Sequence, residues 1–184
     1  MVSVKLLTDL FGNIRRVDII KVVINAGHTK FGKESGAVGK LNESKETRKI
    51  AYELMKQLSG SEHEVIPAVF DRHDNNLKAA VDLANENQAD LFISIHLNGG
   101  PGHGTEIYTW KGKEKPRANK ILERMQKLGF TNRGIKDGTH LYVIKNTKCE
   151  ALLLEICFVA NEIDYSLYTT HGVEKIARAI KESL

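Results

Sequence analysis

Near-continuous apolar segments that alternate with amphipathic segments constrain the fold of this 184-residue chain more than any other feature. Segments 17–27, 90–96 and 151–161 are apolar almost throughout, which is typical of strands that are buried on both faces of a parallel sheet. Between them, segments such as 42–58 place apolar residues at helical intervals. The pattern predicts an α/β fold: a mixed, mostly parallel sheet of about six strands, with helices on both faces.

Weaker signals complete the prediction. The strand expected at 63–70 contains Pro67, which favours the edge of the sheet because proline has no N–H to donate to a neighbouring strand. A helix is marked by Leu77, Ala80, Val81 and Ala84. Further strands are expected at 104–111 and 140–146, and further helices at 116–129 and 172–184. Residues 1–16 are expected to be an N-terminal extension of uncertain order.

Composition excludes several classes of protein. The net charge of +4 and the pI of about 9.0 allow an anionic partner. Because the basic residues are scattered and not interleaved with aromatic ones, a nucleic-acid-binding module is not indicated. The two cysteines give no disulfide framework, and no segment approaches the ~20 apolar residues of a membrane span. The start of the chain lacks the plan of a signal peptide, so we expect synthesis in the cytoplasm or an export route that this sequence does not encode.

A glutamate in the middle of an apolar strand is the strongest sign of a functional site. Glu155 stands between Leu154 and Ile156, where an unpaired carboxylate costs several kcal/mol. It must be neutral, paired with a buried cation, or directed at a metal. The predicted apolar strands offer no obvious cation, which favours the metal.

Two histidines occupy equivalent positions at predicted strand ends. His28 follows the first strand directly after Gly27, and His96 ends the strand at 90–96. Ligands of open α/β sheets bind at the carboxyl ends of the strands. A lone histidine is more often structural, but two at equivalent strand ends indicate a shared site.

Glu43 lies on the face of the helix at 42–58 that also carries Thr47, Ile50, Leu54 and Leu58. A carboxylate at the start of a core-facing stripe either caps the helix or enters a site. The neighbouring Glu46 would lie more toward the flank.

Together these residues offer two imidazoles and a carboxylate, which is a common zinc ligand set, plus a second glutamate to act as general base. His103 is close enough to His96 to be an alternative ligand. Cys157 would share the face of Glu155, and a role as apolar filler is favoured over that of a thiolate nucleophile.

The order of these residues resembles the zinc-dependent N-acetylmuramoyl-L-alanine amidases of the type-3 family. The matching segments are Gly27-His28, Glu43 at the start of a helix, SIHLN at 94–98 and EICFVAN at 155–161. The likeness extends from about residue 19 to residue 184. The family commonly has glycine where this chain has Thr29, and asparagine where it has Thr47.

The resemblance implies an enzyme that hydrolyses the amide between the lactyl group of N-acetylmuramic acid and the L-alanine of the peptidoglycan stem. It implies one Zn²⁺ per chain, held by His28, Glu43 and His96, with Glu155 as the catalytic carboxylate and Asn98 as a substrate contact. Residues 17–184 would be the catalytic domain. The expected partner is peptidoglycan, with a separate wall-binding domain absent from this chain, no nucleic acid, no membrane span and no oligomeric partner assigned.

Two other functions remain open at this level. A zinc peptidase that cuts within the peptidoglycan stem would use the same residues, and a non-catalytic wall-binding module would keep the fold. The chain is expected to act on the bacterial cell wall, either as a phage endolysin or as a domain of a secreted autolysin.

Overall fold

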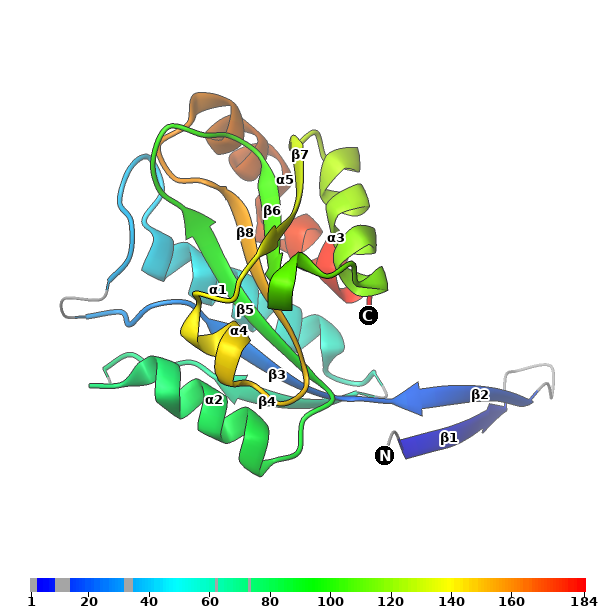
Figure 1. The fold of residues 1–184 in the computed structure, drawn as a ribbon. Helices are drawn as coiled ribbons and strands as arrows, with labels where there is room; N and C mark the ends of the chain where they lie inside the picture. The colour runs from blue at the N-terminus through cyan, green and yellow to red at the C-terminus, as the bar shows by residue number, and fades with distance from the viewer. Residues whose placement is uncertain (1–2, 9–13, 32–34, 62, 73) are drawn as a thin grey trace.

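The computed structural model describes residues 3–8, 14–31, 35–61, 63–72 and 74–184. Its centre is a six-stranded sheet with the strand order β4-β3-β5-β8-β6-β7 (Figure 1). The strands are β3 (Lys21–Ala26), β4 (Glu64–Ala68), β5 (Leu91–Asn98), β6 (Thr105–Thr109), β7 (Asn132–Asp137) and β8 (Glu150–Phe158). The first four in spatial order run parallel, whereas β6 and β7 run parallel to each other and antiparallel to β8. The predicted mixed α/β sheet is confirmed.

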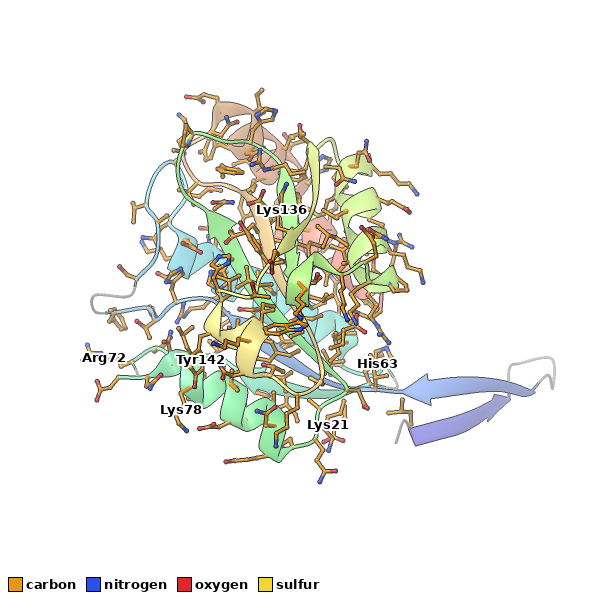
Figure 2. All side chains as sticks on the ribbon, in the orientation of Figure 1. Lys21, His63, Arg72, Lys78, Lys136 and Tyr142 are labelled. Carbon is orange, nitrogen blue, oxygen red and sulfur yellow. The ribbon has the colours of Figure 1, made fainter. Side chains whose placement is uncertain are left out.

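Helices cover both faces of the sheet (Figure 1). The helices α1 (Glu43–Leu58), α3 (Pro116–Lys127) and α5 (Glu162–Lys181) pack on one face around the larger apolar core. The helices α2 (Asn76–Glu86) and α4 (Tyr142–Asn146) pack together on the other face. Lys78 of α2 and Tyr142 of α4 lie on this second side of the molecule (Figure 2).

Burial along α1 agrees with the predicted stripe. Ile50, Leu54 and Leu58 are fully buried, and Thr47 and Glu43 are buried on the same side of the helix. The buried stripe of α1 therefore extends beyond its apolar residues toward the N-terminus of the helix, where it ends at the carboxylate of Glu43.

The edge position predicted from Pro67 is also confirmed. β4 is the outermost strand next to β3, and Pro67 pairs with Ile24 in the register. The missing N–H of proline is tolerated there because only one side of the strand has a neighbour.

The N-terminal region forms a separate two-stranded antiparallel sheet, made of β1 (Ser3–Thr8) and β2 (Ile14–Ile19). The segment predicted as one strand at 17–27 is therefore divided between β2 and β3, which meet at Ile20. Residues 1–2 and 9–13 of the predicted extension lie outside the described residues. The boundary placed at residue 16 falls within β2.

The later elements differ from the prediction in three ways. Segment 140–146 is not a strand: it contains α4, where the adjacent residues Val143 and Ile144 are both buried, as in a helical turn. A short apolar run does not distinguish the two structures. β7 was not predicted, because its half-exposed polar residues show no alternation. The last helix begins at Glu162 and not at 172, and it continues through a break at Gly172, where φ is 67°.

No helix in the described ranges has the length and apolar character that a membrane crossing needs.

Candidate metal centre

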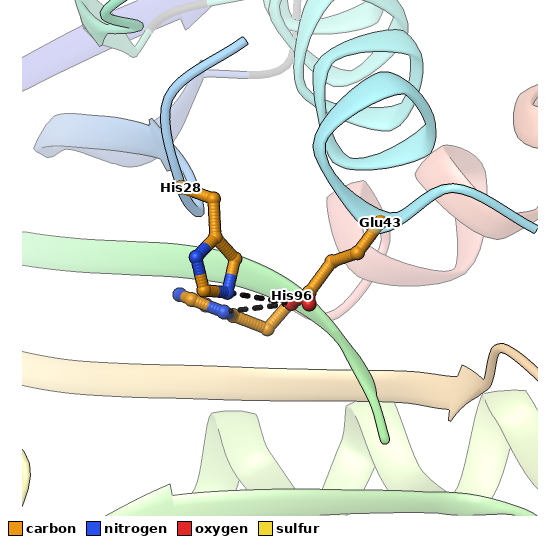
Figure 3. Close-up of side chains that lie close together, drawn as sticks. All are labelled: His28, Glu43 and His96. Carbon is orange, nitrogen blue, oxygen red and sulfur yellow. Dashed lines mark hydrogen bonds and ion pairs between the residues drawn. The ribbon is translucent and has the colours of Figure 1, made fainter. Parts of the chain in front are cut away.

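The predicted ligands His28, Glu43 and His96 come together at the carboxyl ends of β3 and β5 (Figure 3). β3 and β5 are parallel neighbours, so their carboxyl ends meet, and α1 begins above them. One Glu43 oxygen, Oε1, lies 3.0 Å from His96 Nδ1 and 3.2 Å from His28 Nε2. The possible ligand atoms of the three residues all lie within 4.8 Å of one another. The three side chains could therefore hold one metal ion.

Glu43 faces this site because another residue caps the helix. The side chain of Asn42 accepts a hydrogen bond from the backbone N–H of Lys45, which is the capping role. The Glu43 carboxylate instead accepts hydrogen bonds from the backbone N–H groups of Ala37 at 2.8 Å and Leu97 at 3.1 Å. These bonds fix both oxygens and leave Oε1 directed at the two histidines.

The charge of Glu43 suits a cation site. Burial by itself would raise the pKa of Glu43, but the hydrogen bonds and charges of His28 and His96 outweigh it and hold that pKa well below its ordinary value. A buried carboxylate that stays ionised between two imidazoles attracts a divalent ion.

Two glycines make room for this cluster. A Cβ atom on Gly27 would lie 2.4 Å from the His96 ring, and one on Gly36 would lie 2.6 Å from Glu43 Oε2. Larger residues at either position would displace a predicted ligand.

Glu155 lies beside the cluster. In the register of the parallel strands it stands opposite His96, and on its other side it stands opposite Glu106 of β6. Its Oε2 is buried and has no hydrogen-bond partner among the described residues, and no described cation forms an ion pair with it. The alternative of a structural salt bridge therefore finds no support. Burial, together with the charges of Glu43 and Glu106, raises the pKa of Glu155 to about 8.

A network that the sequence did not reveal surrounds Glu106, which is 4% exposed. Its Oε1 accepts hydrogen bonds from Asn98 Nδ2 at 2.8 Å and from the Tyr108 hydroxyl at 3.1 Å. Its Oε2 accepts one from Arg133 Nε at 2.7 Å. Asn98, predicted as a substrate contact, thus donates its amide to Glu106. No pattern in 104–111 distinguished Glu106, because in an alternating strand it counted as a residue of the exposed face.

The other candidates lie apart from the cluster. His103 is exposed and is not among the convergent residues. Glu46 accepts a hydrogen bond from the hydroxyl of Tyr168 at 2.7 Å. Cys157 belongs to the larger core because a register shift between β5 and β8 follows Glu155, so the prediction that it shares the face of Glu155 is wrong. Burial raises the pKa of Cys157, which disfavours a thiolate.

Two residues of α1 hold the backbone beside His28, which is left-handed with φ 63°. The Thr47 hydroxyl donates to the carbonyl of Gly27 at 3.1 Å. The buried guanidinium of Arg48 donates to the carbonyls of His28, Phe70 and Ser44, at 3.1, 2.6 and 2.6 Å. A non-glycine residue needs such support to remain at a positive φ. Thr47 and Arg48 therefore position His28.

Arg48→Met is expected to lower the free energy of unfolding by about 3 kcal/mol, because it removes the donors for three carbonyls in a buried setting. Urea unfolding of the metal-free protein measures the change. The matched control is Arg178→Met, which removes a surface pair with Glu174 and should cost no more than about 0.5 kcal/mol. Equal losses in the two variants would contradict the positioning role of Arg48.

The raised pKa of Glu155 predicts a pH-dependent stability. Between pH 4.5 and about 8 the folded, metal-free protein keeps a proton on Glu155 that the unfolded chain releases. Raising the pH through this window therefore lowers the free energy of unfolding. Glu155→Gln abolishes this loss, so the metal-free variant should exceed metal-free wild type by roughly 5 kcal/mol at pH 9 and match it near pH 4.5. Denaturant unfolding at both pH values tests this, and an equal stability at pH 9 would refute it.

Comparison with known proteins places this geometry in context. The model of the N-acetylmuramoyl-L-alanine amidase family matches residues 22–184. An uncharacterized protein of Clostridium perfringens strain 13 is 33% identical over 175 residues, which cover 90% of this chain and 51% of that protein. The chain thus spans about half the length of the first curated relatives it matches.

Solved structures cover the chain more completely. The catalytic domain of an endolysin that targets Clostridia difficile superposes with a TM-score of 0.80 at 28% identity, covering 89% of this chain and 96% of that domain. The catalytic domain of CwlV, an N-acetylmuramoyl-L-alanine amidase from Bacillus (Paenibacillus) polymyxa var. colistinus, gives a TM-score of 0.78 at 30% identity, covering 90% and 96%.

Proposed function

The chain belongs to the N-acetylmuramoyl-L-alanine amidase family. From this premise we propose that residues 17–184 form a zinc-dependent catalytic domain that acts on the bacterial cell wall. The bond cut is the amide between the lactyl group of N-acetylmuramic acid and the L-alanine of the stem peptide.

One observation supports the proposal: two imidazoles and an ionised carboxylate converge beside Glu155, whose Oε2 is buried without a hydrogen-bond partner among the described residues. A structural ion-pair network would leave no carboxylate without a partner. A hydrolytic site needs this division, because one carboxylate completes the ligand set and the other must remain free to exchange a proton.

The residues present fit a zinc ion. His28, Glu43 and His96 would hold it, since nitrogen donors with one carboxylate are a ligand set that zinc takes in hydrolases. A bound zinc ion lowers the pKa of water to about 7 and polarises the scissile carbonyl. The backbone N–H groups of Ala37 and Leu97, which bind Glu43, keep the carboxylate aligned as a ligand.

Glu155 is assigned the proton transfer. It stands opposite His96 in the sheet, so its carboxylate faces the same space as the ligands. It would accept the proton of the attacking water and return it to the nitrogen of the leaving L-alanine. Its surroundings favour this, because burial and the neighbouring carboxylates raise the pKa of Glu155 and hence its affinity for a proton.

Removal and return of the metal test the proposal. Dialysis against a chelator should abolish the solubilisation of purified peptidoglycan, and about one equivalent of Zn²⁺ per chain should restore it. Mg²⁺ should not restore it, because Mg²⁺ prefers oxygen ligands. Full activity of a protein shown to be free of zinc would contradict a metal-dependent function.

A further inference from the structure

A second candidate site lies at the opposite end of the sheet from the metal centre. There a pocket of about 390 Å³ opens between the segment that follows β6 and the segment that joins α4 to β8. The two segments meet because β6 and β8 are antiparallel, so the end of one strand lies beside the start of the other (Figure 1). This volume falls within the ~300–1,000 Å³ typical of ligand pockets. Ten residues line it: Trp110, Lys113, Lys115, Ile144, Lys145, Thr147, Lys148, Cys149, Glu150 and Ala151.

The lining carries a concentrated positive charge. It includes four lysines and a single acid, Glu150, whose carboxylate is bound by Arg117 at 3.0 Å. In the part of the chain that the structure describes, none of the four lysines forms an ion pair with a carboxylate. Glu114, between two of them in sequence, accepts a hydrogen bond from Asn119. Unpaired ammonium groups around a concave surface attract an anion.

Unsatisfied polar atoms gather at the same place. The Thr147 hydroxyl and Glu150 Oε1, both from lining residues, are buried without a hydrogen-bond partner among the described residues, and so is Nε of Arg117. Buried polar atoms without partners are few in a native protein and require an explanation. Of these three groups, the Thr147 hydroxyl is the donor that belongs to a lining residue, and an anionic oxygen of a ligand would accept a hydrogen bond from it.

Both walls of the pocket are held in place. On one wall, the Thr109 hydroxyl donates to the carbonyl of Lys113 at 2.8 Å. On the other, the side chain of Asn85 bonds to the carbonyl of Asn146 at 3.0 Å and to the N–H of Lys148 at 2.9 Å. The lysines thus extend from a fixed backbone, which lowers the entropy cost of binding.

Trp110 adds an apolar surface to the pocket, which the attraction of an anion by the lysines does not require. It lies in the lining and is 39% exposed, so part of its indole ring is accessible to a ligand. An apolar surface beside ammonium groups suits a chain in which carbon-rich units separate the charges. Because Trp110 is the single exposed aromatic residue in the described lining, the stacking platform of single-stranded nucleic-acid sites is missing.

We propose that this pocket binds a linear polyol-phosphate polymer of the cell envelope, with its phosphodiester groups on the lysines and a polyol unit against Trp110. The choice of an envelope polymer rests on the proposed function, whereas the anionic specificity rests on the pocket. Lysine is a common point-charge partner for phosphate.

The pocket lies at a distance from the metal centre, so binding of a polymer in the pocket would not block the hydrolytic site. Glu150 lines the pocket and Glu155 adjoins the metal centre, five residues further along β8. At about 3.3 Å per residue the two positions are roughly 16 Å apart. A polymer in the pocket would therefore hold the protein on the wall while the metal centre stays open to peptidoglycan.

The test measures the binding of fluorescent poly(glycerol phosphate) to the whole chain, with no muramoyl amide present. Lys145→Gln/Lys148→Gln should weaken binding about tenfold, because two of the four charges on the pocket wall are removed. The matched control, Lys120→Gln/Lys175→Gln, removes two exposed lysines outside the pocket and should leave the affinity within about twofold. All four side chains are exposed, so both proteins should fold.

Each other outcome overturns the proposal. Equal losses in the two double variants would mean that net charge alone attracts the polymer. Equal or tighter binding of polyglutamate would exclude phosphodiester specificity, and tighter binding of single-stranded DNA would make the site one for nucleic acid. No binding by wild type would remove the site altogether. Because no amide is hydrolysed in this assay, failure of the proposed amidase activity would not alter its result.

Discussion

Glu155→Gln should lower the rate of amide hydrolysis by at least about 1,000-fold while the protein still binds its metal. General acid–base catalysis contributes ~100- to 10,000-fold, and the glutamine amide has neither an acidic proton to transfer nor a basic carboxylate oxygen. The buried setting favours the neutral side chain, so the variant should fold at least as stably as wild type. Loss of activity together with full stability would separate catalysis from folding.

The measurement is the initial rate on peptidoglycan, set against the zinc content of the same sample. Glu174→Gln makes the same chemical change at an exposed position on α5 and should retain full activity. Wild-type turnover by Glu155→Gln would disprove the catalytic assignment. Loss of zinc from the variant would assign Glu155 to the ligand set instead.

His96→Ala should lower the affinity for Zn²⁺ by at least about 100-fold, since one of three protein ligands is removed. Competition with a chromogenic chelator measures the affinity directly, without turnover. The sequence offers a matched control in His103, the alternative ligand: His103→Ala should bind zinc as wild type does, because His103 is exposed and stands outside the cluster. The reverse result, with zinc lost from His103→Ala alone, would overturn the proposed ligand set.

The sequence predicted those parts of the fold that depend on repeated local patterns. Apolar runs marked β3, β5 and β8, helical spacing marked α1, and Pro67 marked the edge strand. Glu43 and Glu155 could be singled out because each violates the pattern of its own element. A carboxylate at a position where the pattern requires an apolar residue can be recognised from the sequence alone.

The features that the sequence missed depend on contacts between distant segments. Glu106 follows the alternation of its strand, so only the neighbouring β8 makes it a buried partner of the site. In the sequence, Arg48 does not differ from the other charged residues of its helix. Its role becomes apparent only from the hydrogen bonds that it donates to the carbonyls of His28 and Phe70. The lysines of the second pocket come from two segments about 30 residues apart, which the antiparallel pairing of β6 and β8 brings together.

Identification of the bond that the protein cuts is the decisive test of the proposed amidase function. Purified peptidoglycan is digested with the whole chain, and new amino termini and new reducing sugar ends are quantified with and without chelator. We expect new N-terminal L-alanine, no new reducing ends, and loss of both solubilisation and new termini on chelation. New amino termini on any other residue would make the protein a peptidase of the stem, and no release of either kind would contradict a hydrolytic function.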